Sequence, residues 1–113
     1  MLAGGAGFVT TNHVVGETFT LLRIVKGYGA AAAFLDVLQA SRRLERIFVT
    51  RETESRAFEL LHRYREHPLS FVDGTSFAVM REGRLRHAFA FDRHFATAGF
   101  VRVPADVPAE QVR

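Results

Sequence analysis

Cysteine is absent from this chain of 113 residues. Without thiols neither disulfide bridges nor thiolate metal sites can form, and the composition is compatible with a reducing compartment. Long apolar runs are also missing: none would cross a bilayer, and Met1 to Phe8 lacks the basic segment that opens a signal peptide. The sequence therefore predicts a soluble cytoplasmic protein that does not bind membranes.

Lysine is almost absent as well, because 14 of the 15 basic residues are arginine, and the net charge is +3. A guanidinium group can bind two phosphate oxygens at once, which suits contact with nucleic acid. The arginines are scattered along the chain, however, so charge alone gives an RNA partner only modest support. What the chain has in quantity is apolar side chains, 48% of all residues with eleven Phe, enough for the core of one domain.

The hydrophobic periodicity predicts an α/β fold in which a mostly parallel sheet is flanked by helices. We expect a single domain over residues 1–113, with its core at about 8–103 and a polar tail at 104–113. The expected strands are Phe8–Thr11, Leu44–Thr50, His87–Asp92 and Phe100–Val103, and the expected helices are Asn12–Lys26, Ala30–Ala40, Thr53–His67 and one that begins near Ser70.

Several residues are expected to set the limits and faces of these helices. Asn12 is predicted to cap the first helix, and Gly27 and Gly29 to separate it from the second. Pro68 is predicted to end the third helix. The side chains predicted to pack inward from that third helix are Phe58, Leu61 and Tyr64.

Three acids fall at positions where a carboxylate is costly. Asp73 lies in the first turn of an apolar helix, Asp92 ends an apolar strand, and Glu17 lies on the apolar stripe of the first helix, facing the core. Because helices that follow parallel strands begin at the carboxyl edge of the sheet, we expect all three to converge there. A purely structural interpretation stays open: Ser70 and Asp73 fit a capping box, Asp92 could cap a turn, and Glu17 could be exposed.

A cluster of acids needs protons or cations to persist. Two carboxylates about 5 Å apart repel by roughly 3 kcal/mol at an effective dielectric constant of 20. Oxygen ligands without His or Cys select Mg²⁺ or Mn²⁺, and such ions activate water for attack on phosphorus. The five histidines offer no competing site, and His13 is expected to neighbour Glu17 only in sequence. The pattern indicates phosphodiester hydrolysis.

Three blocks of sequence resemble the PIN-domain ribonucleases, in particular the VapC-like toxins of bacterial toxin–antitoxin pairs. They are TTNHVVGETFTLL from Thr10 to Leu22, LSFVDGTSFAVM from Leu69 to Met80, and AFAFDRHF from Ala88 to Phe95 with Ala98–Gly–Phe100. The resemblance implies a PIN-like three-layer fold and a Mg²⁺- or Mn²⁺-dependent endoribonuclease. It also implies an RNA substrate, a cognate antitoxin protein and a homodimer.

The same resemblance assigns roles to individual residues. Glu17, Asp73 and Asp92 match the acids that hold metal and catalyse cleavage in the family. Thr75 and Ser76 match polar residues that lie close to the site, and Arg93 is expected to contact RNA.

One part of the family pattern has no match. The family opens with a strand that ends in an aspartate, followed by two helices, and nothing before Phe8 corresponds to that strand. We therefore expect an N-terminally truncated domain with one metal ligand fewer, two unpaired sheet edges and impaired activity. A misassigned start, a decayed gene and a short form that borrows a strand all remain open, as does a non-catalytic remnant that binds an antitoxin or RNA.

Overall fold

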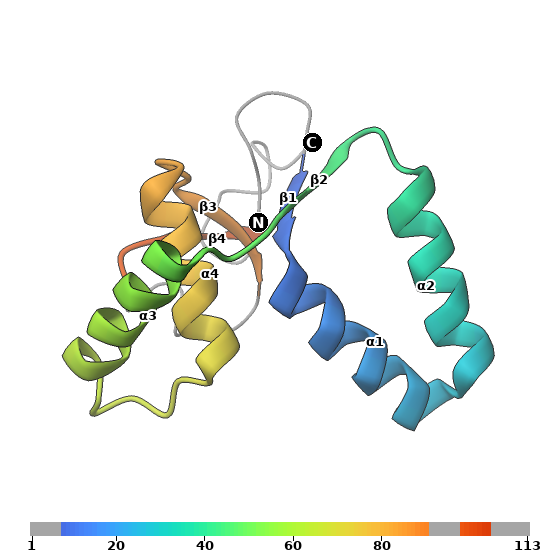
Figure 1. Cartoon of the computed structure of the whole chain (residues 1–113), viewed down its shortest axis with the longest axis horizontal. Helices are drawn as coiled ribbons and strands as arrows, with labels where there is room; N and C mark the ends of the chain where they lie inside the picture. The colour runs from blue at the N-terminus through green and yellow to red at the C-terminus, as the bar shows by residue number, and fades with distance from the viewer. Residues whose placement is uncertain (1–7, 91–97, 105–113) are drawn as a thin grey trace.

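A computed structural model describes residues 8–90 and 98–104 of the chain. Within these residues helices and strands follow one another as an α/β fold, as predicted (Figure 1). Asp92, Arg93 and residues 105–113 of the expected tail lie outside the described residues, and Pro104, expected to open that tail, is the last residue of a strand. The elements are β1 (Phe8–Thr11), α1 (Asn12–Lys26), α2 (Tyr28–Ala40), β2 (Leu44–Ile47), α3 (Arg51–Arg63), α4 (Phe71–Glu82), β3 (His87–Ala90) and β4 (Val101–Pro104).

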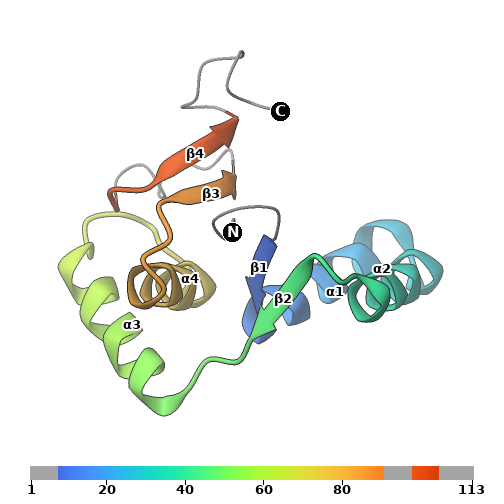
Figure 2. The same ribbon diagram turned by 90° about the horizontal axis from the view of Figure 1, so that it is seen from above.

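The strands form two parallel pairs. β1 pairs with β2, with Phe8 opposite Leu44, and β3 pairs with β4, with His87 opposite Val101 (Figure 2). The parallel direction confirms the prediction. Among the described residues no hydrogen-bonded ladder joins β1 to β3, so the sheet is present as two ribbons. That a further strand belongs between them stays a prediction of the resemblance.

β1 passes into α1 without a connecting loop. The backbone of Thr11 is extended, and its hydroxyl accepts a hydrogen bond from the backbone N–H of Val14 at 3.1 Å, so Thr11 caps the helix. The predicted cap, Asn12, was therefore wrong by one residue. The amide oxygen of Asn12 instead accepts the backbone N–H of Val49 at 2.9 Å and ties the start of α1 to the segment after β2.

α1 and α2 form a hairpin that meets the α3–α4 pair only through the start of α1, while α2 lies on the far side (Figure 1). Gly27 makes the turn with φ of +95°, a conformation that favours glycine. Gly29, predicted to be a second break, lies inside α2 instead. Much apolar surface of the hairpin is exposed, and the residues that expose it are Leu21, Ile24, Val25, Tyr28 and Val37.

α3 and α4 pack against each other as an antiparallel pair and bury the face of α3 that carries Thr53, Ala57 and Leu60. Of the three residues predicted to lie inward, Leu61 and Tyr64 do pack toward α4 or the core, whereas Phe58 is 47% exposed, so that part of the prediction was wrong. The predicted end was also wrong, because α3 stops at Arg63 and Pro68 lies in the loop that follows.

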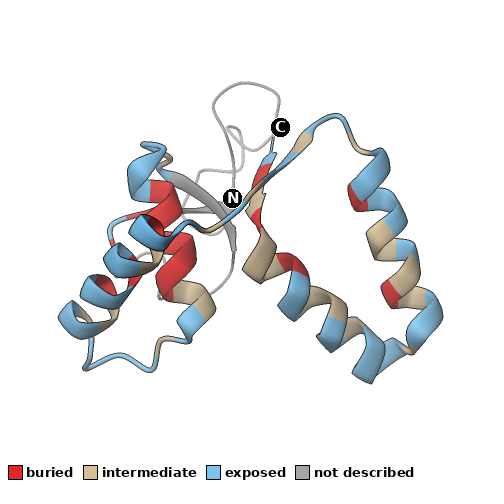
Figure 3. Cartoon of the chain, in the orientation of Figure 1, coloured by how far each residue is buried: buried red, intermediate tan, exposed pale blue. Residues whose placement is uncertain are grey.

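The main core lies around α4, where the buried residues are most concentrated (Figure 3). Phe77 and Met80 are fully buried, and the Phe77 ring lies 5.6 Å from that of Phe100. Each such side chain contributes roughly 1.5–3 kcal/mol by leaving water. Gly74 permits the close approach of α3, since a Cβ there would lie 2.7 Å from Cγ of Leu61.

No helix in the part of the chain that the structure describes is both long enough and apolar enough to span a membrane.

Candidate metal-binding site

Asp73 is fixed at the N-terminus of α4 by a reciprocal pair of hydrogen bonds. Its Oδ2 accepts the backbone N–H of Ser70 at 3.0 Å, and its own N–H donates to Oγ of Ser70 at 3.0 Å. This is the capping box that the sequence suggested. The capping box uses only one carboxylate oxygen, because Oδ1 has no hydrogen-bond partner among the described residues. The partial positive charge of the helix N-terminus also favours an anion at this position.

Glu17 lies on α1 beside the first turn of α4. With Val72, the neighbour of Asp73, it lines an open hollow of about 500 Å³. The first turn of α4 also contacts α1 through Phe71, whose ring centre lies 5.5 Å from that of His13. The start of α1 is therefore in contact with the first turn of α4, and each of these segments carries one of the predicted acids. The complete lining of the hollow is His13, Gly16, Glu17, Thr20, Leu21, Ile24 and Val72.

The environment of Glu17 differs from the expectation. Its side chain is exposed and does not face the core, because α1 buries Val15 and half-buries Phe19 and Leu22 on other sides of the helix. Exposure to an open hollow removes the desolvation cost that the sequence pattern suggested. The carboxylate is left free to bind a cation.

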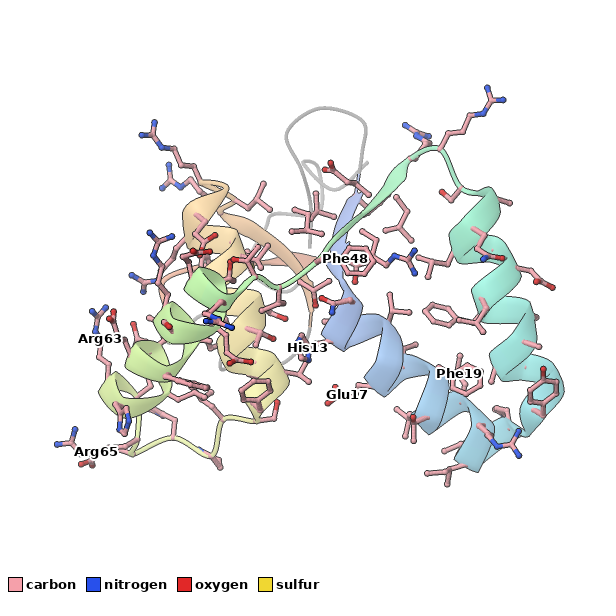
Figure 4. All side chains as sticks on the ribbon, viewed as in Figure 1. His13, Glu17, Phe19, Phe48, Arg63 and Arg65 are labelled. Atoms are coloured by element: carbon pink, nitrogen blue, oxygen red, sulfur yellow. The ribbon has the colours of Figure 1, made fainter. Side chains whose placement is uncertain are left out.

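His13 was not expected near the acids, and this expectation was wrong. His13 and Glu17 line the same hollow and both project from α1 toward the side on which α4 lies (Figure 4). Residues four apart are neighbours on one face of a helix, so the spacing itself contained the signal.

The other predicted site residues are Asp92, Arg93, Thr75 and Ser76, and the structure describes only the last two. Asp92 comes two residues after β3 ends, and both Asp92 and Arg93 lie outside the described residues. Thr75 and Ser76 are buried in α4, and the Thr75 hydroxyl donates to the backbone carbonyl of Val72 at 2.8 Å. The Thr75 bond thus ties the turn that carries Asp73, and the role of both residues at the site stays a prediction.

The donor set suits a hard cation but is incomplete within the described residues, where no group of three His, Asp or Glu side chains could hold a metal ion. Glu17 and the free Oδ1 of Asp73 offer oxygen ligands of the kind that Mg²⁺ and Mn²⁺ prefer. A third ligand would have to come from elsewhere, and Asp92 is the residue that the sequence predicts for it.

Two curated proteins share much of the sequence. The 23S rRNA-specific endonuclease VapC20 from Mycobacterium tuberculosis, in strains CDC 1551 and H37Rv, is 48% identical over 96 residues. The match covers 84% of this chain and 72% of that protein.

A solved structure shares the fold. The crystal structure of Mycobacterium tuberculosis VapC20, described as a sarcin-ricin loop cleaving toxin, matches with a TM-score of 0.79 and 44% identity, over 86% of this chain and 74% of that one. The sequence model of the PIN domain matches residues 2–101. With a family match over most of its length and a similar solved fold, the chain belongs to the PIN-domain family.

Proposed function

We propose that this protein is a metal-dependent endoribonuclease of the toxin type, which hydrolyses phosphodiester bonds in RNA in the cytoplasm. The proposal is carried by two carboxylates on helices that contact each other, Asp73 held by its capping box at the start of α4 and Glu17 exposed on α1. The identity to a 23S rRNA-specific endonuclease supports the same activity.

The proposed cleavage reaction assigns a role to each of the following residues. Glu17, Asp73 and Asp92 would hold Mg²⁺ or Mn²⁺, which when bound neutralises phosphate charge and lowers the pKa of the attacking water. Ser70 keeps the Asp73 carboxylate in one orientation, so little ordering remains to be done when substrate arrives. The open hollow beside Glu17 admits a phosphate backbone from solvent.

Replacing Asp73 by Asn tests the site. The amide retains an oxygen that can accept the Ser70 N–H but loses the charge that holds a cation. We expect Mn²⁺ affinity to fall, and RNA cleavage with Mn²⁺ to fall on the order of 100-fold or more. Glu17→Gln should act in the same direction. The measurements are Mn²⁺ titration by calorimetry and cleavage of a labelled RNA hairpin.

Asp36→Asn is the matched control, since Asp36 is an exposed acid on α2 and does not line the hollow. It removes the same charge and should leave Mn²⁺ affinity unchanged. Normal cleavage by Asp73→Asn would refute the assignment of the site.

A second function is favoured by the α1–α2 hairpin, whose exposed apolar residues suit a protein partner. Under this alternative the chain is a non-catalytic module that binds an antitoxin or RNA. A cognate antitoxin and a homodimer are the partners we propose for either function. Saturable Mn²⁺ binding distinguishes the two, because only the nuclease requires it.

A further inference from the structure

Three aromatic rings from three helices lie in a row at the mouth of the candidate site. Phe71, the first residue of α4, is 40% exposed, and its ring centre lies 6.2 Å from that of Phe58 on α3. On its other side the ring of His13 on α1 lies 5.5 Å away, edge to face at 70°. We call His13, Phe58 and Phe71 the aromatic row.

The aromatic row is not part of the main core. That core lies around Phe77 and Met80, further along α4, and α3 turns Ala57 and Leu60 toward it. Phe58 is 47% exposed, and water reaches much of both phenylalanine rings. A single exposed Phe needs no explanation, but linked exposed rings beside a candidate active site do.

The row and the acids occupy the same helical turns. Phe71 precedes Asp73 by two residues, and His13 precedes Glu17 by one turn and lines the same hollow. A group bound against these rings would therefore lie next to whatever the carboxylates hold. For an RNA whose phosphate is at the acids, that group is a neighbouring nucleobase.

Nucleobases stack on aromatic side chains, and each such contact is worth about 1–3 kcal/mol by alanine substitution. The bases of a duplex are already stacked, whereas those of loops and single strands can be splayed out. The rings in the row are inclined to one another at 52° and 70°, so a base stacking on one ring would meet the edge of the next.

We propose that the aromatic row binds an unpaired nucleobase next to the cleaved phosphodiester. This inference rests on the proposed nuclease function, which supplies the phosphate. In this proposal the base stacks on the ring of Phe71, and the rings of Phe58 and His13 contact the edges of the base.

Binding of short RNA in EDTA tests the proposal without cleavage. Fluorescence anisotropy would compare a single-stranded oligonucleotide with the same strand carrying abasic sites, for the unmodified chain and for Phe71→Ala. We expect Phe71→Ala to weaken binding of the intact strand on the order of tenfold and to change binding of the abasic strand little. Phe71→Tyr should retain binding, and thermal unfolding would show that each variant is folded.

Tyr28→Ala is the matched control, because Tyr28 is an exposed ring at the tip of the hairpin with Arg23 over its face. Equal loss with Tyr28→Ala, equal binding of intact and abasic strands, or preference for duplex RNA would each overturn the proposal. So would loss of self-association in Phe71→Ala with RNA binding unchanged, which would make the row a protein interface.

The two proposals fail separately. Base-dependent binding without any cleavage would refute the nuclease and retain the aromatic row. Cleavage with binding that ignores the bases would refute the row and retain the nuclease.

Discussion

The two oxygens of Asp73 have different tasks. Oδ2 accepts the N–H of Ser70 and helps α4 to begin, while Oδ1 is left for a ligand. A local sequence pattern was enough to predict this capping box, because its partners are three residues apart. The tie between Asn12 and Val49 could not be predicted in this way, because 37 positions separate its partners and only the fold brings them together.

Ser70→Ala should lower both stability and metal affinity. It removes the hydroxyl that accepts the Asp73 N–H, at a cost of about 1 kcal/mol in the free energy of unfolding. It also loosens the turn that orients the carboxylate, so Mn²⁺ binding should weaken. Urea unfolding and Mn²⁺ titration measure the two effects.

Thr50→Ala separates these effects, because Thr50 caps α3 through the same kind of bond, from the Thr53 N–H at 3.1 Å, away from the acids. It should cost similar stability and leave Mn²⁺ affinity unchanged. An equal loss of Mn²⁺ affinity in both variants would mean that the Ser70 effect is only general destabilisation.

At the scale of the elements, α3 and α4 approach closely because Gly74 has no side chain. Gly74→Ala would place a Cβ 2.7 Å from Cγ of Leu61 and force the helices apart. We expect a loss of about 1–3 kcal/mol in the free energy of unfolding, measured in urea.

Gly16→Ala is the control for the change in helix propensity, because nothing lies within 4 Å of a Cβ added there. It should stabilise α1 by up to about 1 kcal/mol. If Gly74→Ala were equally stabilising, Leu61 would have room to move, and the close packing would be less restrictive than the distance indicates.

The same close packing explains why the inward face of α3 was predicted only in part. Leu61 packs against Gly74 and Tyr64 against the core, as predicted, but Phe58 does not. The contact with α4 buries Ala57 and Leu60 instead, because a small residue such as Ala57 fits where two helices lie close together. The bounds of α1, by contrast, were predictable because its hydrophobic period and its terminal glycine agree, although its cap was placed one residue too late.

At the scale of the whole molecule, the candidate site lies where two parts of the fold meet. β1, β2, α1 and α2 form one part, and α3, α4, β3 and β4 form the other, with contacts between α1 and α4 joining them. The sequence predicted contact between the regions that carry Glu17 and Asp73, from the rule that helices after parallel strands begin at one edge, and α1 does contact the first turn of α4. That the two carboxylates themselves meet stays a prediction. The sequence could not predict that Glu17 is exposed, because this depends on which side of α1 packs against α2 and which side packs against α4.

A cation held by both acids would connect the two parts. Because binding to the folded state stabilises it, Mn²⁺ at 100 times its dissociation constant should add about 2.7 kcal/mol to the free energy of unfolding. Thermal unfolding with and without Mn²⁺ measures the gain, and either Asp73→Asn or Glu17→Gln should remove most of it. A gain of the same size in both variants would place the ion elsewhere.

The direct passage from β1 into α1 has a mechanical consequence. Thr11 ends the strand, Asn12 begins the helix, and the Asn12 amide is anchored to Val49, so no hinge separates Glu17 from the sheet. Asp73, in contrast, follows the loop from Tyr64 to Ser70. If RNA entry changes the distance between the two acids, the change has to arise in the loop before α4. Glu17 would then keep its position relative to β1 and β2.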